Sequence, residues 1–149
     1  MIWNAQDMIA TTHATLHGDA DWRITGMALD NRKTNPGDLF IALKGENHDG
    51  HDYVAAAADA GAVAALVSRK VDASIPQLVA GDSLTALRDL AKASRQRSSA
   101  TVVAITGSVG KTGTKQIIST CLQSLGKTHA STGNFTTHIG APLSLALMP

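Results

Sequence analysis

The segment AITGSVGKTGTKQII, residues 104–118, is the feature that most constrains the fold of this 149-residue chain. The apolar run TVVAI leads into it, and continuous runs of this kind are typical of buried parallel strands. Two glycines, Gly107 and Gly110, then precede an amphipathic stretch that begins at Lys111 and ends near Leu125. We therefore predict a buried strand, a glycine loop and a helix in direct succession.

This loop has the parts that a phosphate-binding loop needs. Glycines let backbone N–H groups approach phosphate oxygens closely, and a helix that starts at the loop directs free N–H groups at the anion. Lys111 is placed to reach the β- and γ-phosphates, and Thr112 is placed to ligate Mg²⁺. The common G-x-x-x-x-G-K-[ST] spacing needs a glycine at Ile105, so this loop is a variant. The flanking strand and helix disfavour the alternative, a strand-to-helix turn without a ligand.

The rest of the chain alternates strand-like and helix-like segments, which indicates an α/β fold. Strands are expected at residues 22–30, 39–44, 62–68, 75–81, 101–107 and 127–132. Helices are expected after Asn4, at 53–61, from Asp82 or Ser83 to about Arg97, at 111–125 and at 139–147.

Two domains are predicted from this order of segments. Residues 1–80 form a small α/β domain, and residues 81–149 begin a parallel-sheet ATPase domain of the P-loop type. The second sheet has too few strands to cover its faces, so we expect the sequence to be truncated.

Charge and cysteine content exclude several functional classes. The net charge is +1, from 13 basic and 12 acidic residues, which gives no electrostatic basis for binding nucleic acid or an anionic membrane. The single cysteine, Cys121, excludes an intrachain disulfide, and its helical spacing predicts a small core residue. The sequence shows neither the pattern of a signal peptide nor that of a membrane span, so we expect a soluble, cytoplasmic monomer.

The run HDGHD places His48, Asp49, His51 and Asp52 close together and raises the question of a metal site. A further cluster of ligands does not accompany it, so a solvated loop is the favoured interpretation.

Three separated stretches resemble one known family. The loop Thr106–Thr112 reads T-G-x-x-G-K-T, a variant carried by the Mur ligases and the folylpolyglutamate synthases. The stretch Asp30–Val67 resembles the N-terminal domain shared by MurE-type and MurF-type enzymes, a domain that folylpolyglutamate synthases lack. The stretch Thr132–Ala146, TGNFTTHIGAPLSLA, resembles the MurF-type pattern G-N-x-N-N-x-I-G-x-P-L. Over nearly its whole length the chain is thus similar to the Mur ligase family, MurF type.

The resemblance implies an ATP-dependent amide ligase that adds D-Ala-D-Ala to UDP-MurNAc-tripeptide through an acyl phosphate, for peptidoglycan synthesis. ATP and Mg²⁺ would be its cofactors. It implies catalytic roles for Lys111 and Thr112, with Thr112 as the Mg²⁺ ligand. The implied ATP-binding residues are Thr106, Gly107, Ser108, Val109, Gly110, Lys111, Thr112 and Gly113. The implied residues for the UDP-linked substrate are Asn31, Arg32, Lys44, Gly45, Asn134, Thr136, Thr137 and His138.

The chain departs from the family pattern at several positions. Asn31 stands where Ser or Thr is usual, and Gly113 in the first helical turn costs up to about 1 kcal/mol. Thr136 and Thr137 replace an Asn-Asn pair, although MurE-type enzymes carry a Thr-Thr pair there that contacts the UDP-sugar.

Other parts of the family pattern have no counterpart in these residues. They are the downstream acidic Mg²⁺ ligand, the carbamylated lysine, the adenine pocket and the amine-binding C-terminal domain. We therefore expect the chain by itself to be an inactive fragment. A non-catalytic UDP-sugar-binding module and a MurE-type amino-acid ligase are the alternatives.

Overall fold

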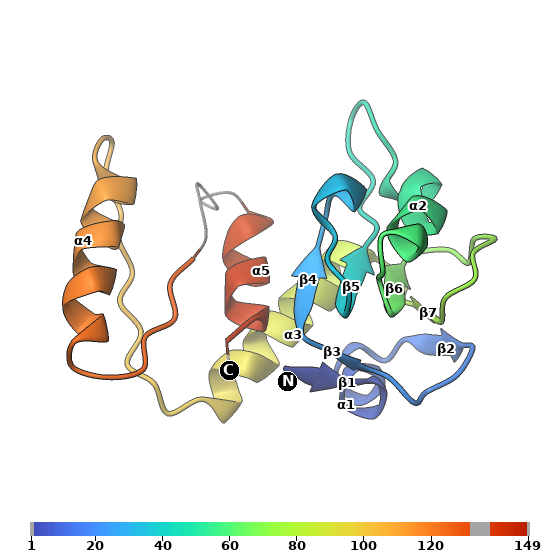
Figure 1. The fold of residues 1–149 in the computed structure, drawn as a ribbon, viewed down its shortest axis with the longest axis horizontal. Helices are drawn as coiled ribbons and strands as arrows, with labels where there is room; N and C mark the ends of the chain where they lie inside the picture. The colour runs from blue at the N-terminus through green and yellow to red at the C-terminus, as the bar shows by residue number, and fades with distance from the viewer. Residues whose placement is uncertain (1, 132–137, 149) are drawn as a thin grey trace.

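The computed structural model describes residues 2–131 and 138–148 and contains a five-stranded sheet. The strand order is β2 (Thr15–His17), β7 (Gln77–Val79), β6 (Ala64–Val67), β5 (Asp38–Ile41) and β4 (Gly26–Ala28). Strands β4 to β7 are parallel, and β2 pairs antiparallel with β7 at one edge (Figure 1). A separate antiparallel pair joins β1 (Trp3–Asn4) to β3 (Arg23–Ile24).

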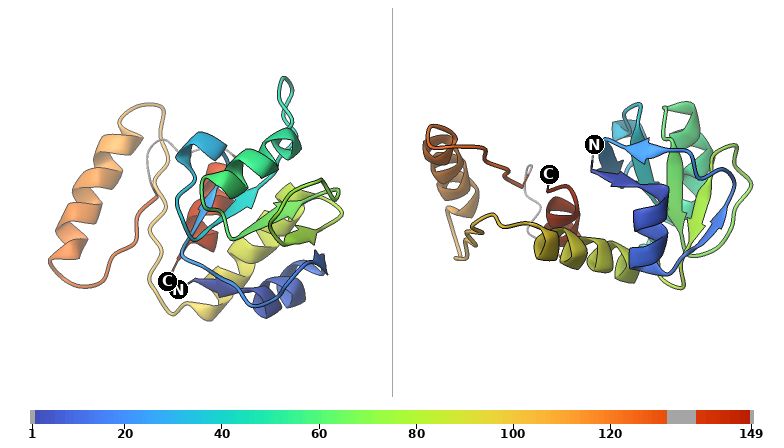
Figure 2. Two further views of the ribbon diagram at one scale, coloured as in Figure 1. Left: turned by 45° about the vertical axis from the view of Figure 1, so that its right-hand side comes forward. Right: turned by 90° about the horizontal axis from the view of Figure 1, so that it is seen from below.

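Both faces of the sheet are covered, because its strands are apolar on both sides. In β5, Leu39 belongs to one core cluster and Phe40 to the other. Helix α2 (Val54–Asp59) packs on the Phe40 side. Helices α1 (Ala5–Thr12), α3 (Ser83–Arg97) and α5 (Gly140–Ala146) contribute to the cluster on the Leu39 side. The result is a three-layer arrangement, and the predicted α/β class is confirmed (Figures 1 and 2).

The predicted helix starts are confirmed at α1 and α3. Asn4 Oδ1 accepts a hydrogen bond from the backbone N–H of Asp7 at 2.8 Å, and Asp82 Oδ2 accepts one from that of Thr85 at 2.8 Å. Each carboxamide or carboxylate satisfies an N–H that has no partner inside its helix. The side chains of Leu87 and Leu90 on α3 are fully buried.

Helix α5 packs on α3 and is tied to the N-terminus of the chain. The indole Nε1 of Trp3 donates to the carbonyl oxygen of Ala146 at 2.9 Å, and Ser94 Oγ donates to the same oxygen at 3.3 Å. The guanidinium of Arg97 lies 3.9 Å from the centre of the Trp3 ring. Residues from both predicted domains therefore contribute to one core. The boundary near residue 80 stays a prediction.

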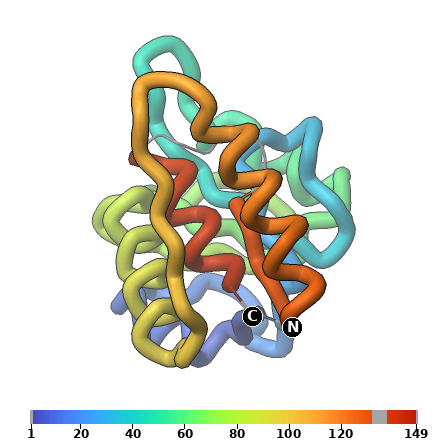
Figure 3. The backbone as a smooth tube through the Cα atoms, turned by 90° about the vertical axis from the view of Figure 1, so that its left-hand side faces the viewer, coloured from blue at the N-terminus to red at the C-terminus, as the bar shows by residue number. Residues whose placement is uncertain are grey.

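Helix α4 (Lys111–Gln123) stands apart from the sheet, and in Figure 3 it and the chain leading into it lie in front of α5. The predicted strands at 101–107 and 127–132 are wrong for the described residues, because 101–107 and 127–131 pair with no neighbouring strand. A strand persists only where a neighbour takes its N–H and C=O groups.

The apolar side chains of this segment are correspondingly exposed. Val103 is 55% exposed and Ile117 is 67% exposed. Cys121 is also exposed, so its prediction as a core residue is wrong: within the described residues, α4 stands apart from the core clusters that would bury it.

The observed strands differ from the predicted strands in two smaller respects. The strand predicted at 22–30 is divided into β3 and β4, which belong to different sheets, and the short strands β1 and β2 were not predicted. Among the described residues, none of the helices combines the length and hydropathy needed to cross a bilayer.

Candidate functional site

The glycine loop has the backbone geometry that its sequence predicts. Gly110, with φ of 79°, lies in the left-handed region and forms the N-cap of α4. A Cβ at this position would meet no atom within 4 Å, so backbone conformation rather than space requires the glycine. Gly110 makes no side-chain hydrogen bond that would cap the helix.

Lys111 lies in the first turn of α4, and its ammonium donates a hydrogen bond to the carbonyl oxygen of Gly107. The lysine side chain thus folds back over the loop at the N-terminal end of α4. An uncapped thirteen-residue helix with a lysine at its start fits a phosphate group, because its dipole and its lysine both favour negative charge there. Thr112 follows in the same turn, in the position predicted for a Mg²⁺ ligand.

The predicted substrate residues Asn31 and Arg32 lie in a 3₁₀ turn, Asn31–Lys33, directly after β4. The carboxylate of Asp30 receives two hydrogen bonds from the Arg32 guanidinium, at 2.9 Å from Nε and 2.7 Å from Nη2. Side-chain hydrogen bonding from Arg32 is the main reason that the pKa of Asp30 is lowered to about 2. The Arg32 side chain is 81% exposed, so it is held in position while much of its surface remains open to a ligand.

The predicted residues Lys44 and Gly45 lie in a tight turn after β5. Lys44 forms a β-bridge with Asp49, and the N–H of Gly45 donates to the carbonyl of His48 at 2.8 Å. A Cβ on Gly50 would lie 2.8 Å from the backbone nitrogen of Leu43, so this close approach requires glycine.

His51 is buried, which corrects part of the solvated-loop prediction for HDGHD. Its Nδ1 lies 2.6 Å from Asp49 Oδ1, and its Nε2 accepts the backbone N–H of Ser68 at 2.9 Å. Because Nε2 is an acceptor, the ring carries its proton on Nδ1. Hydrogen bonds from the backbone and side chain of His51, followed by one from Arg69, lower the pKa of Asp49.

Ser68 Oγ also lies 3.0 Å from His51 Nε2, so the three side chains resemble a Ser-His-Asp triad. The backbone N–H of Ser68, however, occupies the one lone pair of Nε2 that a general base would use. We therefore interpret the Asp49–His51–Ser68 cluster as a structural clamp between the turn Gly50–Tyr53 and the end of β6.

A cavity of about 150 Å³, here called the α3 cavity, lies at the carboxyl ends of β5 and β6. It brings together the predicted residues Lys44 and His138. Its other lining residues are Ala42, Leu43, Ser68, Asp82, Ser83, Leu84 and Ile139. Sequence reasoning missed Ser68 and Ser83. Their positions at or just after the carboxyl ends of predicted strands could have indicated them, because ligands of parallel sheets bind beyond these ends.

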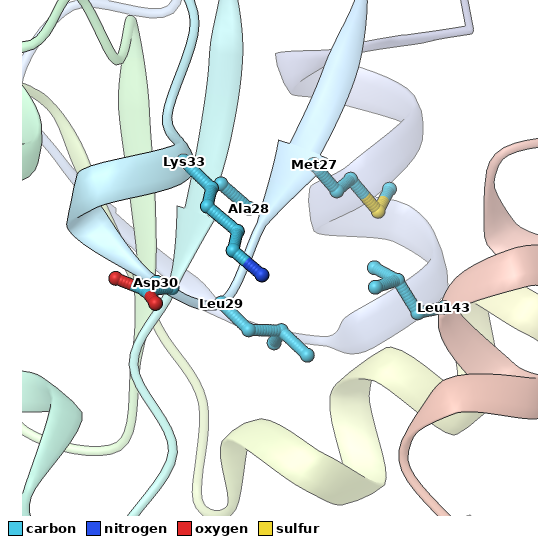
Figure 4. A pocket seen from close by; sticks show the side chains of 6 residues that line it. All are labelled: Met27, Ala28, Leu29, Asp30, Lys33 and Leu143. Atoms are coloured by element: carbon cyan, nitrogen blue, oxygen red, sulfur yellow. The ribbon is translucent and has the colours of Figure 1, made fainter. Parts of the chain in front are cut away.

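A second cavity of about 160 Å³ is lined by Met27, Ala28, Leu29, Asp30, Lys33 and Leu143. Figure 4 shows Met27 and Leu143 pointing toward one another, while the carboxylate of Asp30 points away from them. This cavity is mostly apolar and adjoins the turn that carries Asn31 and Arg32. Neither of the two cavities is lined by residues of the glycine loop. The predicted residues Asn134, Thr136 and Thr137 lie outside the described residues.

Comparison with known proteins identifies the family of the chain. Residues 23–96 match the model of the Mur ligase family, catalytic domain, and residues 105–149 match that of the Mur ligase middle domain. Over 126 residues the chain is 44% identical to the UDP-N-acetylmuramoyl-tripeptide–D-alanyl-D-alanine ligase of Escherichia coli K12, covering 85% of this chain and 28% of that protein.

Two crystal structures are also similar. The chain resembles MurF from Acinetobacter baumannii with a TM-score of 0.84 and 36% identity, over 99% of this chain and 33% of that one. It resembles the MurF ligase from Thermotoga maritima, solved in complex with ADP, with a TM-score of 0.65 and 36% identity, over 81% of this chain and 28% of that one. The chain spans about a third of the length of these relatives. It belongs to the Mur ligase family and corresponds to the N-terminal third of its MurF-type members.

Proposed function

We propose that the chain supplies the UDP-sugar-binding domain and the ATP-phosphate loop of a ligase that joins D-Ala-D-Ala to UDP-MurNAc-tripeptide. The observation that carries this proposal is the start of α4, where Gly110 takes a left-handed conformation and Lys111 folds over an uncapped helix end. The names of the MurF-type relatives supply the substrates.

At the glycine loop, Lys111 and the first N–H groups of α4 would hold the phosphates of ATP, and Thr112 would ligate Mg²⁺. The remaining loop residues, Thr106 to Val109 and Gly113, would shape the loop around the phosphates. When bound, ATP supplies the phosphoryl group that activates the tripeptide carboxylate toward an amine. The contribution of this chain is to position that phosphoryl group and to neutralise its charge.

At the carboxyl edge of the sheet, Asn31, Arg32, Lys44 and Gly45 would hold the UDP end of the substrate. These residues lie in the turns that follow the neighbouring parallel strands β4 and β5, so one ligand can contact both turns. His138 lines the α3 cavity beside Lys44, which supports its assignment to the same substrate. The assignments of Asn134, Thr136 and Thr137 rest on the motif alone. We also propose that the protein is a monomer.

A hybrid protein tests this proposal. Residues 1–149 replace the corresponding N-terminal part of the Escherichia coli relative, and phosphate release is measured with ATP, Mg²⁺, UDP-MurNAc-tripeptide and D-Ala-D-Ala. We expect release that needs all of these substrates and is lost in Lys111→Ala. A folded hybrid that binds UDP-MurNAc-tripeptide but releases no phosphate would instead support the non-catalytic UDP-sugar-binding module.

A further inference from the structure

The hydroxyl of Ser83 is a buried polar group that the fold leaves unsatisfied. Ser83 is 2% exposed, and within the described part of the chain its Oγ has no hydrogen-bond partner. A buried hydroxyl without a partner costs about 1–3 kcal/mol, and such groups are rare in native proteins. Ser94, a buried serine on the same helix, does have a partner, the carbonyl oxygen of Ala146 at 3.3 Å.

Ser83 lines the α3 cavity at the first residue of the fifteen-residue helix α3. Lys44 lines the same cavity from the turn after β5. The N-terminus of a long helix and a lysine both favour a negatively charged group in the space between them.

The carboxylate of Asp82, which also lines the cavity, is engaged as the cap of α3. Its Oδ2 accepts hydrogen bonds from the backbone N–H of Thr85 at 2.8 Å and from the Thr85 hydroxyl at 2.7 Å. Arg88, one turn further along α3, also interacts favourably with it. Asp82 is therefore occupied as the helix cap, and Ser83 and Lys44 remain to contact a ligand.

The size of the cavity limits what it can hold. At about 150 Å³, it has room for a phosphoryl group. We infer that Ser83 is a substrate-binding residue whose hydroxyl donates a hydrogen bond to a phosphate oxygen of the UDP-linked substrate in the α3 cavity. This inference rests on the proposed function and adds a residue that the family motifs did not indicate.

The test compares the 149-residue chain with its Ser83→Ala and Ser94→Ala variants. Amide chemical-shift titrations with uridine, UDP and UDP-MurNAc-tripeptide measure binding, and thermal unfolding measures stability. Because a hydrogen bond to a charged group is lost, Ser83→Ala should lower the affinity for UDP and for UDP-MurNAc-tripeptide by about tenfold each. The response to uridine should be unchanged. Its melting temperature should stay the same or rise, because no hydrogen bond within the protein is removed.

Ser94→Ala is the matched control, since it removes a buried hydroxyl that already has a partner. It should lower the melting temperature and leave UDP affinity unchanged. Three results overturn the inference: equal UDP affinity in wild type and Ser83→Ala, a loss confined to UDP-MurNAc-tripeptide, or a fall in the melting temperature of Ser83→Ala as large as that of Ser94→Ala. If the wild type binds neither UDP nor UDP-MurNAc-tripeptide, the proposed function itself fails, and this inference fails with it.

Discussion

The indole Nε1 of Trp3 donates a hydrogen bond to the carbonyl oxygen of Ala146, 2.9 Å away, and so joins the first strand to the last helix. Both residues are buried, and Ala146 is fully so. This contact places α5, and with it His138 and Ile139 at the helix start, against the N-terminal sheet. The wall of the α3 cavity therefore depends on a contact at the opposite end of α5.

Replacing Trp3 with Phe tests this dependence. An aromatic ring is kept, but the N–H and part of the buried indole are lost, so we expect the free energy of unfolding to fall by about 2 kcal/mol. Hydrogen exchange at the α5 amides of Leu143 and Leu147 should become faster. Trp22→Phe is the control, because the Trp22 indole N–H donates to the nearby carbonyl of Asp19 rather than to α5. Equal exchange at α5 in both variants would contradict the docking role of Trp3.

The Asp49–His51–Ser68 cluster predicts a contrast between two substitutions. His51→Ala removes a buried ring and leaves the N–H of Ser68 without its acceptor, so unfolding free energy should fall by about 3 kcal/mol. Ser68→Ala keeps that backbone hydrogen bond and should cost less than about 1 kcal/mol. Urea unfolding of both variants measures the difference. A comparable loss in the two variants would show that the Ser68 hydroxyl, rather than its backbone, holds the clamp.

The ion pair between Asp30 and Arg32 predicts a pH dependence of stability. The folded pKa of Asp30 is about 2, below its ordinary value of 3.8, so the folded state favours the ionised carboxylate. The pair contributes its full stability above about pH 4, and the contribution is lost as pH falls toward 2. Asp30→Asn retains a side-chain oxygen that can cap the turn but lacks the charge. The stability difference between wild type and Asp30→Asn should therefore shrink over this pH range; a constant difference would argue against the ion pair.

The predicted domain boundary is tested with two fragments. We predict that residues 1–80 fold by themselves, because they contain the whole five-stranded sheet and α2. A fragment of residues 1–98 should be more stable, because Leu87 and Leu90 of α3 are buried against the sheet. Amide spectra and urea unfolding of both fragments measure this. A spectrum without dispersion for residues 1–80 would place the boundary after α3.

Local signals in the sequence predicted the sheet-bearing half of the fold. The caps Asn4 and Asp82 marked the starts of two helices. The apolar runs identified β5, β6 and β7, whose partner strands all lie within residues 1–80. The run TVVAI has the same composition as a buried strand but pairs with nothing in the described residues. An apolar pattern shows that a segment can be buried, whereas burial itself depends on partner strands.

The candidate site was predictable to a different extent in its two parts. The proposed phosphate loop could be identified from Gly110 and Lys111, because phosphate binding requires a fixed local spacing. The α3 cavity was not, since Lys44, Ser83 and His138 come from three separate segments that only the tertiary fold brings together.

The assignment of the glycine loop to nucleotide phosphates is tested most directly by equilibrium binding. ATP with Mg²⁺ is titrated into the wild-type chain and into Lys111→Ala. Lys115→Ala serves as the control, because Lys115 lies one turn further along α4 and donates to the carbonyl of Ser131 at 2.6 Å. Titration calorimetry or amide shifts should show binding to the wild type and to Lys115→Ala, and a loss of at least tenfold in Lys111→Ala. Equal ATP affinity in the wild type and Lys111→Ala would contradict the assignment of this loop to nucleotide phosphates.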